Sequence, residues 1–211
     1  MAATADPGGP ETATSEPRRP AAPPPSRRRL RVVAGWVLPV VAALLLAFGL
    51  HVFALQTFSI PSASMEPTIG IGDRILVWKA FFTWHDVHQG DIVVFTRPPR
   101  DHCPGPPDDD LVKRVIALPG QTIYSAGNSI YVDGRRLREP YLPPRDPLGA
   151  QIPAASRATP FRVPAGEFYV MGDNRQVSCD SRFWGPIKGS SMVGKAVLLF
   201  WRDGHPDVHF F

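Results

Sequence analysis

The longest apolar stretch of the chain lies near its N-terminus and carries no charged residue from Val32 to Leu50. It can be extended to Phe53, which gives a run of 22 residues, 32–53. At a rise of about 1.5 Å per residue, a helix of that length would cover the roughly 30 Å hydrocarbon core of a bilayer. Pro39 would disturb a soluble helix, but membrane-spanning helices tolerate proline. The pattern therefore predicts one transmembrane helix over residues 32–53.

A buried soluble helix or a cleaved signal peptide would give a similar run. However, a helix that is apolar on every side has no place to be buried in a chain of 211 residues. A signal peptide has a shorter apolar region and ends at an A-x-A-like site, which the following HVFALQTFS lacks. Four arginines precede the run, and no Lys or Arg follows it as far as Met65. The positive-inside rule then places the N-terminus in the cytoplasm and the residues after Phe53 outside it.

From about Phe58 to Phe211 the pattern changes to short segments rich in Val, Ile, Phe and Tyr. Gly, Pro, Asp or Asn bound these segments, which is typical of β-strands. Asp133-Gly134 is a hairpin signal, and no stretch beyond the apolar run has convincing helical periodicity. We expect residues 58–211 to form a mostly β domain, a compact antiparallel β-barrel or sandwich. The strand candidates are DRILVWK, GDIVVFTR, LVKRVIAL, QTIYSA, SIYVDG, GEFYVMG and KAVLLFW.

Residues 1–31 are rich in Ala, Pro, Arg, Ser and Thr and nearly lack large apolar side chains. Such a segment cannot bury enough apolar surface to order itself, so we expect a disordered cytoplasmic leader. The leader holds six Arg and three acidic residues, whereas the remaining 180 residues hold 17 basic and 16 acidic ones. Nucleic-acid binders normally have a basic face on the folded part. The charge distribution therefore predicts no nucleic-acid partner.

Two serines, Ser62 and Ser64, follow the apolar run in the stretch IPSASMEPTIG. A serine nucleophile needs a base, but the GxSxG elbow is absent and no stretch is built around any of the six histidines. A Ser-His-Asp triad stays open, because its members need only meet in space. A lysine can replace histidine if burial lowers the pKa of its amine. Lys113, in LVKRVIAL, has the most apolar neighbours, although that stretch alone better fits a solvated Lys-Arg pair at a strand edge.

The stretch MGDNRQVSCDSRFWG, residues 171–185, crowds polar side chains directly after the strand candidate EFYV. A long solvated turn and a set of internally paired polar groups fit this pattern equally well.

Taken in order, these features resemble the type I signal peptidases. The resemblance covers the apolar run and about residues 58–187, through FSIPSASMEPTI, GDIVVF, LVKRVIALPG and MGDNRQVSCDSRFWG. It implies a membrane-bound serine endopeptidase that removes signal peptides from secreted preproteins after A-x-A-like sites. The protein would be a single-pass protein of the cell membrane, with an extracytoplasmic catalytic domain. Its partners would be preproteins and the lipid bilayer, and the mechanism would need no cofactor and no metal.

The resemblance also implies roles for individual residues. Ser64 would be the nucleophile and Lys113 the general base. Ser62 would donate its hydroxyl to the oxyanion hole, and Ser178 would hold the lysine in place. Other matching positions have a structural role near the site, namely Asp173, Asn174, Arg175, Asp180 and Arg182. The positions that match the substrate cleft are Ile60, Pro61, Met65 and Val112.

The chain departs from the family pattern at a few points. The 51 residues between Gly120 and Gly172 leave little room for a large second domain, so we expect a compact form. Val177 stands where the family often has Asn. Cys103 and Cys179 would both lie outside the cytoplasm, where disulfides persist, and we predict that they are bonded to each other.

The apolar segment AFFTW, residues 80–84, has two interpretations. It dips into the membrane interface or packs in the core, and the two are equally compatible with the sequence. Two other functions also stay open. One is a catalytically silent, membrane-tethered β domain that binds secreted proteins. The other is a self-cleaving repressor of the related Ser/Lys fold, which would need a DNA-binding domain where this chain has its apolar run.

Overall fold

The computed structural model describes residues 27–79, 82–103, 110–143, 151–153 and 155–211. Side chains are not described for residues 27–34 and 50–53. The chain divides into two units, residues 1–45 and 46–211. Most of the expected leader, residues 1–26, lies outside the described residues.

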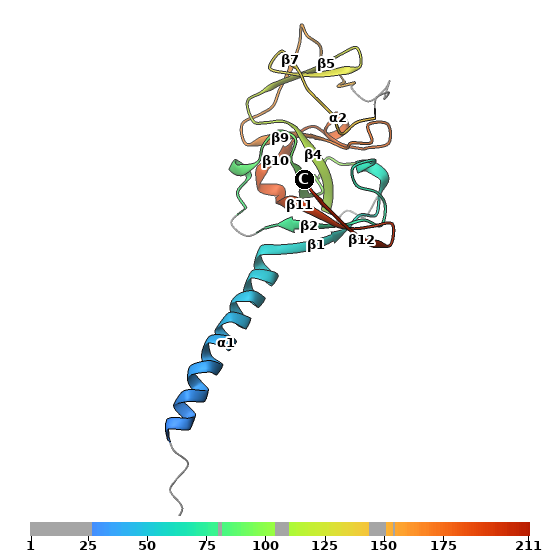
Figure 1. Ribbon diagram of the computed structural model, residues 1–211. Coiled ribbons are helices and arrows are strands. Elements are labelled where there is room, and N and C mark those ends of the chain that lie inside the picture. Colours follow the sequence, from blue (N-terminus) through green and yellow to red (C-terminus); the bar gives the residue numbers. More distant parts are fainter. Residues whose placement is uncertain (1–26, 80–81, 104–109, 144–150, 154) are drawn as a thin grey trace, which may run out of the picture. The chain divides into compact units, whose positions relative to one another are not determined.

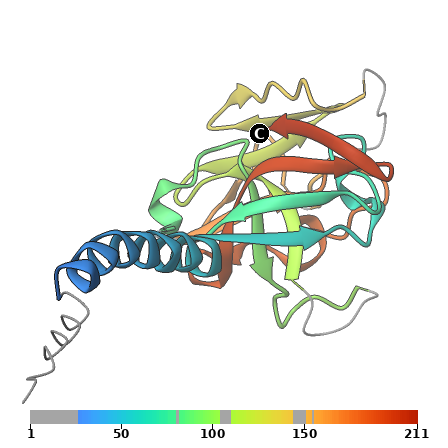
Figure 2. The same cartoon turned by 60° about the horizontal axis from the view of Figure 1, so that its bottom comes forward.

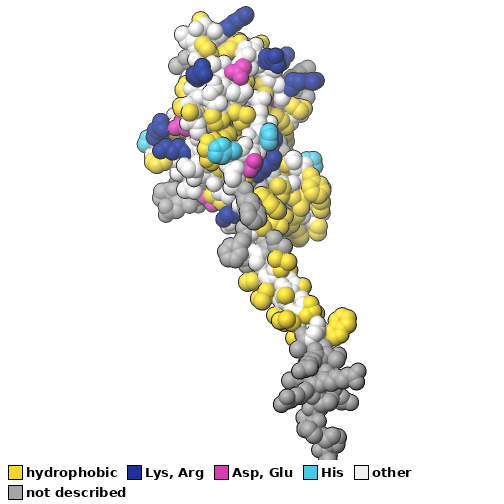
Figure 3. Space-filling model, turned by 90° about the vertical axis from the view of Figure 1, so that its left-hand side faces the viewer, with side chains coloured by type: hydrophobic (Ala, Val, Ile, Leu, Met, Phe, Trp, Pro, Cys, Tyr) yellow, Lys and Arg dark blue, Asp and Glu magenta, His cyan; other side chains and the backbone are white. Residues whose placement is uncertain are grey.

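Helix α1 runs from Arg27 to Ala54 and contains Pro39, so it begins five residues before the predicted boundary at Val32. Large apolar side chains in its described part are exposed, among them Trp36 and Leu44. Figure 3 shows hydrophobic side chains over most of the visible face of this part. Within the described residues, no helix combines the length and the apolar character needed to cross a membrane. The predicted span, 32–53, begins and ends in residues whose side chains are not described.

The residues after α1 form two antiparallel sheets, which confirms the expectation of a mostly β domain (Figure 1). The larger sheet has the order β1-β2-β11-β3-β4-β9-β10, and β12 pairs with β11. Its strands are β1 (Leu55–Ser59), β2 (Arg74–Trp78), β3 (Ile92–Thr96), β4 (Asp110–Ala117), β9 (Glu167–Met171), β10 (Ile187–Lys188), β11 (Met192–Arg202) and β12 (His205–Phe210). In Figure 2, β2 lies between β1 and the red strands, pairing with β1 on one side and with β11 on the other.

The smaller sheet has the order β7-β6-β5-β8. Its strands are β5 (Thr122–Ala126), β6 (Ser129–Val132), β7 (Arg135–Arg136) and β8 (Phe161–Arg162). The predicted turn joins β6 to β7, where Asp133 and Gly134 have φ of 48° and 76°. A type I′ hairpin turn requires such positive values, which is why Asp-Gly is favoured there.

Four short helical segments connect the strands. They are η1 (Ala63–Met65), η2 (Trp84–Asp86), α2 (Ser181–Trp184) and η3 (Gly189–Ser191). Phe82 and Trp84 pack against the buried cluster that contains Phe95 and Phe168. Core packing is therefore confirmed for these two members of the AFFTW segment, whereas residues 80 and 81 lie outside the described residues.

Candidate active site

The fold brings together Ser64, from the turn after β1, and Lys113, from strand β4 of the larger sheet. Ser64 lies in η1, a single turn that follows β1, and Lys113 lies on β4. Lys113 Nζ donates a hydrogen bond to Ser64 Oγ at 2.7 Å and another to the Val112 carbonyl oxygen at 3.0 Å. The first distance is within the range expected of a nucleophile and its base.

The side chain of Lys113 is buried, and the residue is 4% exposed. The sequence interpretation of a solvated Lys-Arg pair is therefore wrong. Successive side chains of a strand point to opposite faces of the sheet. Lys113 reaches Ser64 on one face, and Arg114, 8% exposed, pairs with Asp173.

Burial lowers the pKa of Lys113 from its usual 10.5 to about 8, because desolvation disfavours the charged amine. The carboxylates of Asp180, Asp101 and Asp173 oppose this shift, since they favour the ammonium form. At a pKa near 8, roughly a tenth of the amines are neutral at pH 7, whereas an ordinary lysine has about one in a few thousand. The site thus supplies a usable base near neutral pH.

Ser62 lies beside the candidate nucleophile, with its Oγ 3.3 Å from Ser64 Oγ. The backbone of the η1 turn is fixed by Asn174. The Asn174 backbone N–H donates to the Ser64 carbonyl oxygen, and the Asn174 side-chain amide donates to the Ala63 carbonyl oxygen, each at 3.1 Å. Asn174 thereby ties the polar stretch after β9 to the turn that carries Ser64.

The polar stretch after β9 is not a solvated turn, because its buried charges are paired, partly within the stretch and partly with residues outside it. Asp173 is 1% exposed and receives two hydrogen bonds from Arg114, at 2.8 and 2.6 Å. Asp180 is fully buried, accepts from the Gly172 N–H at 3.0 Å, and binds the Arg182 guanidinium at 2.8 Å. Buried charges are normally paired in this way, because an unpaired one is costly.

Ser178 lies near the Ser64–Lys113 pair but does not make the expected contact with Lys113. Ser178 is 2% exposed, and its Oγ has no hydrogen-bond partner among the described residues. A Cβ placed on Gly172 would overlap both Ser178 Oγ and the Ser64 carbonyl oxygen. Ser178 and the Ser64 backbone therefore both lie close to Gly172, and the structure does not show a hydrogen bond from Ser178 to Lys113.

A cleft of about 450 Å³ contains Ser64 and Lys113. All four residues expected in a substrate cleft line it, namely Ile60, Pro61, Met65 and Val112. Further lining residues were missed by sequence reasoning, namely Phe58, Arg97, Asp101, Asp110, Leu111 and Val177. Of these, Arg97 and Asp101 form an ion pair at 3.5 Å that is almost fully buried. Nothing in their Pro-rich surroundings distinguishes them from residues of an ordinary solvated loop.

Cys103 and Cys179 also line this cleft, and the structure joins them by a disulfide with their Cα atoms 6.4 Å apart. The bond connects the loop after β3 to the stretch that carries Ser178. Asp101 lies near both sulfurs, but a disulfide offers no thiolate to a metal. This group is therefore not a metal site.

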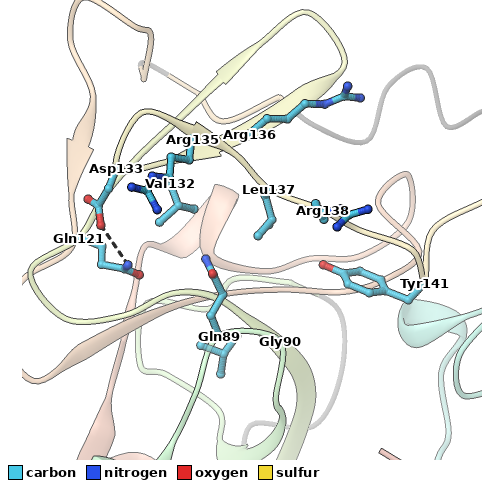
Figure 4. Close-up of a pocket in the computed structure, with 11 residues that line it drawn as sticks. Gln89, Gly90, Gln121, Val132, Asp133, Arg135, Arg136, Leu137, Arg138 and Tyr141 are labelled. Atoms are coloured by element: carbon cyan, nitrogen blue, oxygen red, sulfur yellow. Dashed lines mark hydrogen bonds between the residues drawn. The ribbon is translucent and has the colours of Figure 1, made fainter.

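A second cavity, of about 630 Å³, is lined by residues of both sheets (Figure 4). Its described lining includes Gln89, Arg135, Arg138 and Tyr141, but neither member of the Ser64–Lys113 pair. The chemistry is therefore assigned to the smaller cleft.

The chain is similar to known proteins over most of its length. Residues 33–201 match a family model described as signal peptidase, peptidase S26. A signal peptidase I of Leptolyngbya laminosa is 34% identical over 205 residues, which cover 95% of this chain and 93% of the relative. A signal peptidase I of Mycobacterium tuberculosis is 35% identical, over 89% of this chain and 76% of the relative.

A probable signal peptidase I of Synechocystis is 39% identical over 77% of this chain and 79% of the relative. A solved structure of a signal peptidase I from Enterococcus faecalis is 28% identical, with a TM-score of 0.42, over 52% of this chain and 96% of that chain. Because the family model covers most of the chain and the relatives match along most of their own lengths, the chain belongs to the signal peptidase family, peptidase S26.

Proposed function

We propose that this signal peptidase is a membrane-bound serine endopeptidase in which Ser64 is the nucleophile and Lys113 is the general base. The observation that carries the proposal is the 2.7 Å contact between Lys113 Nζ and Ser64 Oγ at a buried position. The neutral amine accepts the hydroxyl proton while the serine oxygen attacks the scissile carbonyl. The resulting ammonium donates that proton to the leaving amine, so that a neutral amine and an acyl-enzyme are formed.

The second half of the reaction repeats these steps with water. The neutral Lys113 takes a proton from water, the hydroxide attacks the acyl ester, and the Ser64 oxygen leaves with the proton from the ammonium. In both halves a negative charge develops on the former carbonyl oxygen. The Ser62 hydroxyl and the Ser64 backbone N–H are the donors proposed to stabilise it.

We infer that the substrates are secreted preproteins cut after A-x-A-like residues. This inference is supported by the family membership and by the apolar lining beside the pair, from Ile60, Met65 and Val112. A cleft of about 450 Å³ is large enough to hold a segment of peptide. Family membership also favours this activity over a silent binding domain and over a self-cleaving repressor.

The proposal includes a membrane anchor with a cytoplasmic N-terminus and an extracytoplasmic catalytic domain. Its support is the uncharged run from Val32 to Leu50, preceded by clustered arginines. The Cys103–Cys179 disulfide is further support, because disulfides persist in oxidising compartments.

The test uses the full chain in detergent and a preprotein that carries an A-x-A site. Ser64→Ala and Lys113→Met should each lower kcat by about 10³-fold or more, because each removes one member of a unit that acts together. Lys79→Met is the matched control, since Lys79 is exposed and hydrogen-bonds to Gln56. If both active-site variants cut the preprotein as fast as the wild type, the proposed mechanism is wrong.

A further inference from the structure

We propose that the Glu139–Tyr141 segment positions the catalytic serine and lysine, although it touches neither of them. It acts through two buried arginines, Arg114 and Arg175, which lie beside the two halves of the site. The inference rests on the proposed function. It assigns a role to residues of the connection after β7 that lie outside the motifs on which the resemblance rests.

The first contact is the ion pair between Glu139 and Arg175. Arg175 lies in the stretch after β9, its side chain is fully buried, and its Nη2 donates to Glu139 Oε1 at 2.5 Å. Burial alone would lower the pKa of the Arg175 guanidinium, but the charge and hydrogen bond of Glu139, together with Tyr141 and Asp173, raise it overall. Arg175 Nε also donates to the Gly172 carbonyl oxygen at 3.0 Å. Loss of Glu139 would leave a buried charge without its partner, which is strongly unfavourable.

The second contact is a stacking interaction between Tyr141 and Arg114. The Arg114 guanidinium carbon lies 3.9 Å from the centre of the Tyr141 ring, and such planar stacking orients an arginine. The Tyr141 hydroxyl donates to Glu139 Oε1 at 3.1 Å, so one carboxylate oxygen contacts both side chains. The ring and the ion pair therefore form one connected unit.

Through Arg114 and Arg175, these two contacts are connected to both Lys113 and Ser64. Arg114 directly follows Lys113 on β4 and holds Asp173 by two hydrogen bonds. Asp173 and Arg175 flank Asn174, which donates to the carbonyl oxygens of Ala63 and of the nucleophile. A shift of either arginine would thus move the base strand relative to the nucleophile's turn. A misplacement of about 1 Å in such a pair can cost about 10²-fold in rate.

Open space beside the ring makes Tyr141 sensitive to truncation. Tyr141 lines the second cavity, and Figure 4 shows its ring at one end of that space. Gly90 lines the same cavity, and its carbonyl oxygen accepts from Arg114 Nη1 at 2.8 Å. A smaller side chain at position 141 would let water reach the stacked face of the Arg114 guanidinium. Arg114 would then be held less firmly, and so would Asp173, which is bound to it by two hydrogen bonds.

The test compares Glu139→Gln, Tyr141→Leu and Tyr141→Phe in the full chain in detergent. Glu139→Gln and Tyr141→Leu should lower kcat by about 10- to 100-fold, with KM within about threefold because the cleft lining is untouched. The midpoint of the pH dependence should move upward, since a displaced Lys113 is better hydrated. Tyr141→Phe keeps the ring and should recover most of the lost kcat.

The matched control is Tyr131→Leu. Tyr131 stacks on Tyr124 in the smaller sheet, with ring centroids 5.0 Å apart, and its cross-strand partner is Arg136 on β7 rather than Arg114 or Arg175. This control should lower the melting temperature and leave both kcat and the pH midpoint of the folded enzyme unchanged.

The inference is overturned if Glu139→Gln and Tyr141→Leu keep the wild-type kcat and pH midpoint and lose only thermal stability. It is equally overturned if Tyr131→Leu shows the same loss of kcat. Should Tyr141→Leu fail to fold, Glu139→Gln decides the question below its melting temperature. Failure of the proposed function looks different, because the wild type would then be inactive or Ser64→Ala would remain active.

Discussion

At the scale of single residues, Lys113 differs from the other three lysines by its burial. Lys79 and Lys188 are exposed, and Lys195 forms an ion pair with Asp91 at the surface. The apolar neighbours of Lys113 in LVKRVIAL indicated it as a candidate base, but a strand of that pattern has two possible facings. Whether the Lys113 side chain is buried on the Ser64 side depends on which segments pack over β4. These segments are distant in the sequence, so the residues around Lys113 do not reveal them.

Asp101 carries the first prediction, because its carboxylate raises the pKa of Lys113 against the effect of burial. Asp101→Asn removes that negative charge and keeps an oxygen that can accept the hydrogen bond from the Cys103 N–H. The pKa of Lys113 should then fall further below about 8. The pH at which kcat/KM is half-maximal should move to lower pH, and a pH–rate profile measures it. An unchanged midpoint, or a shift to higher pH, would contradict this electrostatic account.

The roles of Asp101 and Ser178 could not be predicted from the sequence around them. Asp101 lies in a Pro-rich loop that the disulfide holds at the cleft, so its role depends on a tertiary constraint. Ser178 was expected to contact Lys113 by resemblance, but in the structure its hydroxyl has no partner among the described residues. Contacts that depend on side-chain orientation in a turn cannot be derived from spacing alone.

At the scale of elements, the approach between the β9–α2 stretch and η1 depends on Gly172. A Cβ at this position would overlap Ser178 Oγ and the Ser64 carbonyl oxygen. Gly172→Ala should therefore push the two segments apart, lower kcat by about 10²-fold and lower the melting temperature. Enzyme assays and thermal unfolding of the purified variant measure both effects.

Gly70→Ala is the matched control for this change. A Cβ on Gly70 would meet the Asp73 side chain at 3.7 Å, which is ordinary contact. This variant should behave like the wild type in both measurements. If Gly172→Ala is also like the wild type, the two segments are not held as closely as the structure shows.

Strands with alternating or continuous apolar residues were predictable, whereas the two strands β1 and β12 of the larger sheet were not. GDIVVFTR and LVKRVIAL became β3 and β4, and the Asp-Gly turn joins β6 to β7. β1 was missed because its polar residues continue directly from the apolar run. β12 was missed because it contains Pro206 and is mostly exposed, so burial leaves no pattern in it.

At the scale of the whole molecule, the mostly β class follows from composition and turn spacing, but the sheet order does not. β11 pairs with both β2 and β3, which are more than 90 residues earlier in the chain. Local patterns carry no information about such pairing. The family resemblance, in contrast, could be recognised from the order of the motifs, and the family match confirms it.

The proposed anchor makes a prediction for the whole chain. Leu44→Arg with Leu45→Arg places two charges within the uncharged run, at a cost of about 2.5–3.5 kcal/mol each in a bilayer centre. The wild type should float with lipid vesicles in a density gradient, and the double variant should remain in the soluble fraction. Val208→Arg, at an exposed position of β12, should float like the wild type. Flotation of the double variant together with the vesicles would contradict an anchor in this run.

The central claim is that a buried, neutral lysine activates Ser64, and the pH dependence of kcat/KM tests it most directly. This quantity reports the pKa of groups in the free enzyme. Because the neutral amine is the active form, the rate should rise with pH and level off, with a midpoint near the pKa of about 8 given by burial of Lys113. A midpoint near 6.5, as expected of a histidine, or near the 10.5 of an exposed lysine, would contradict it.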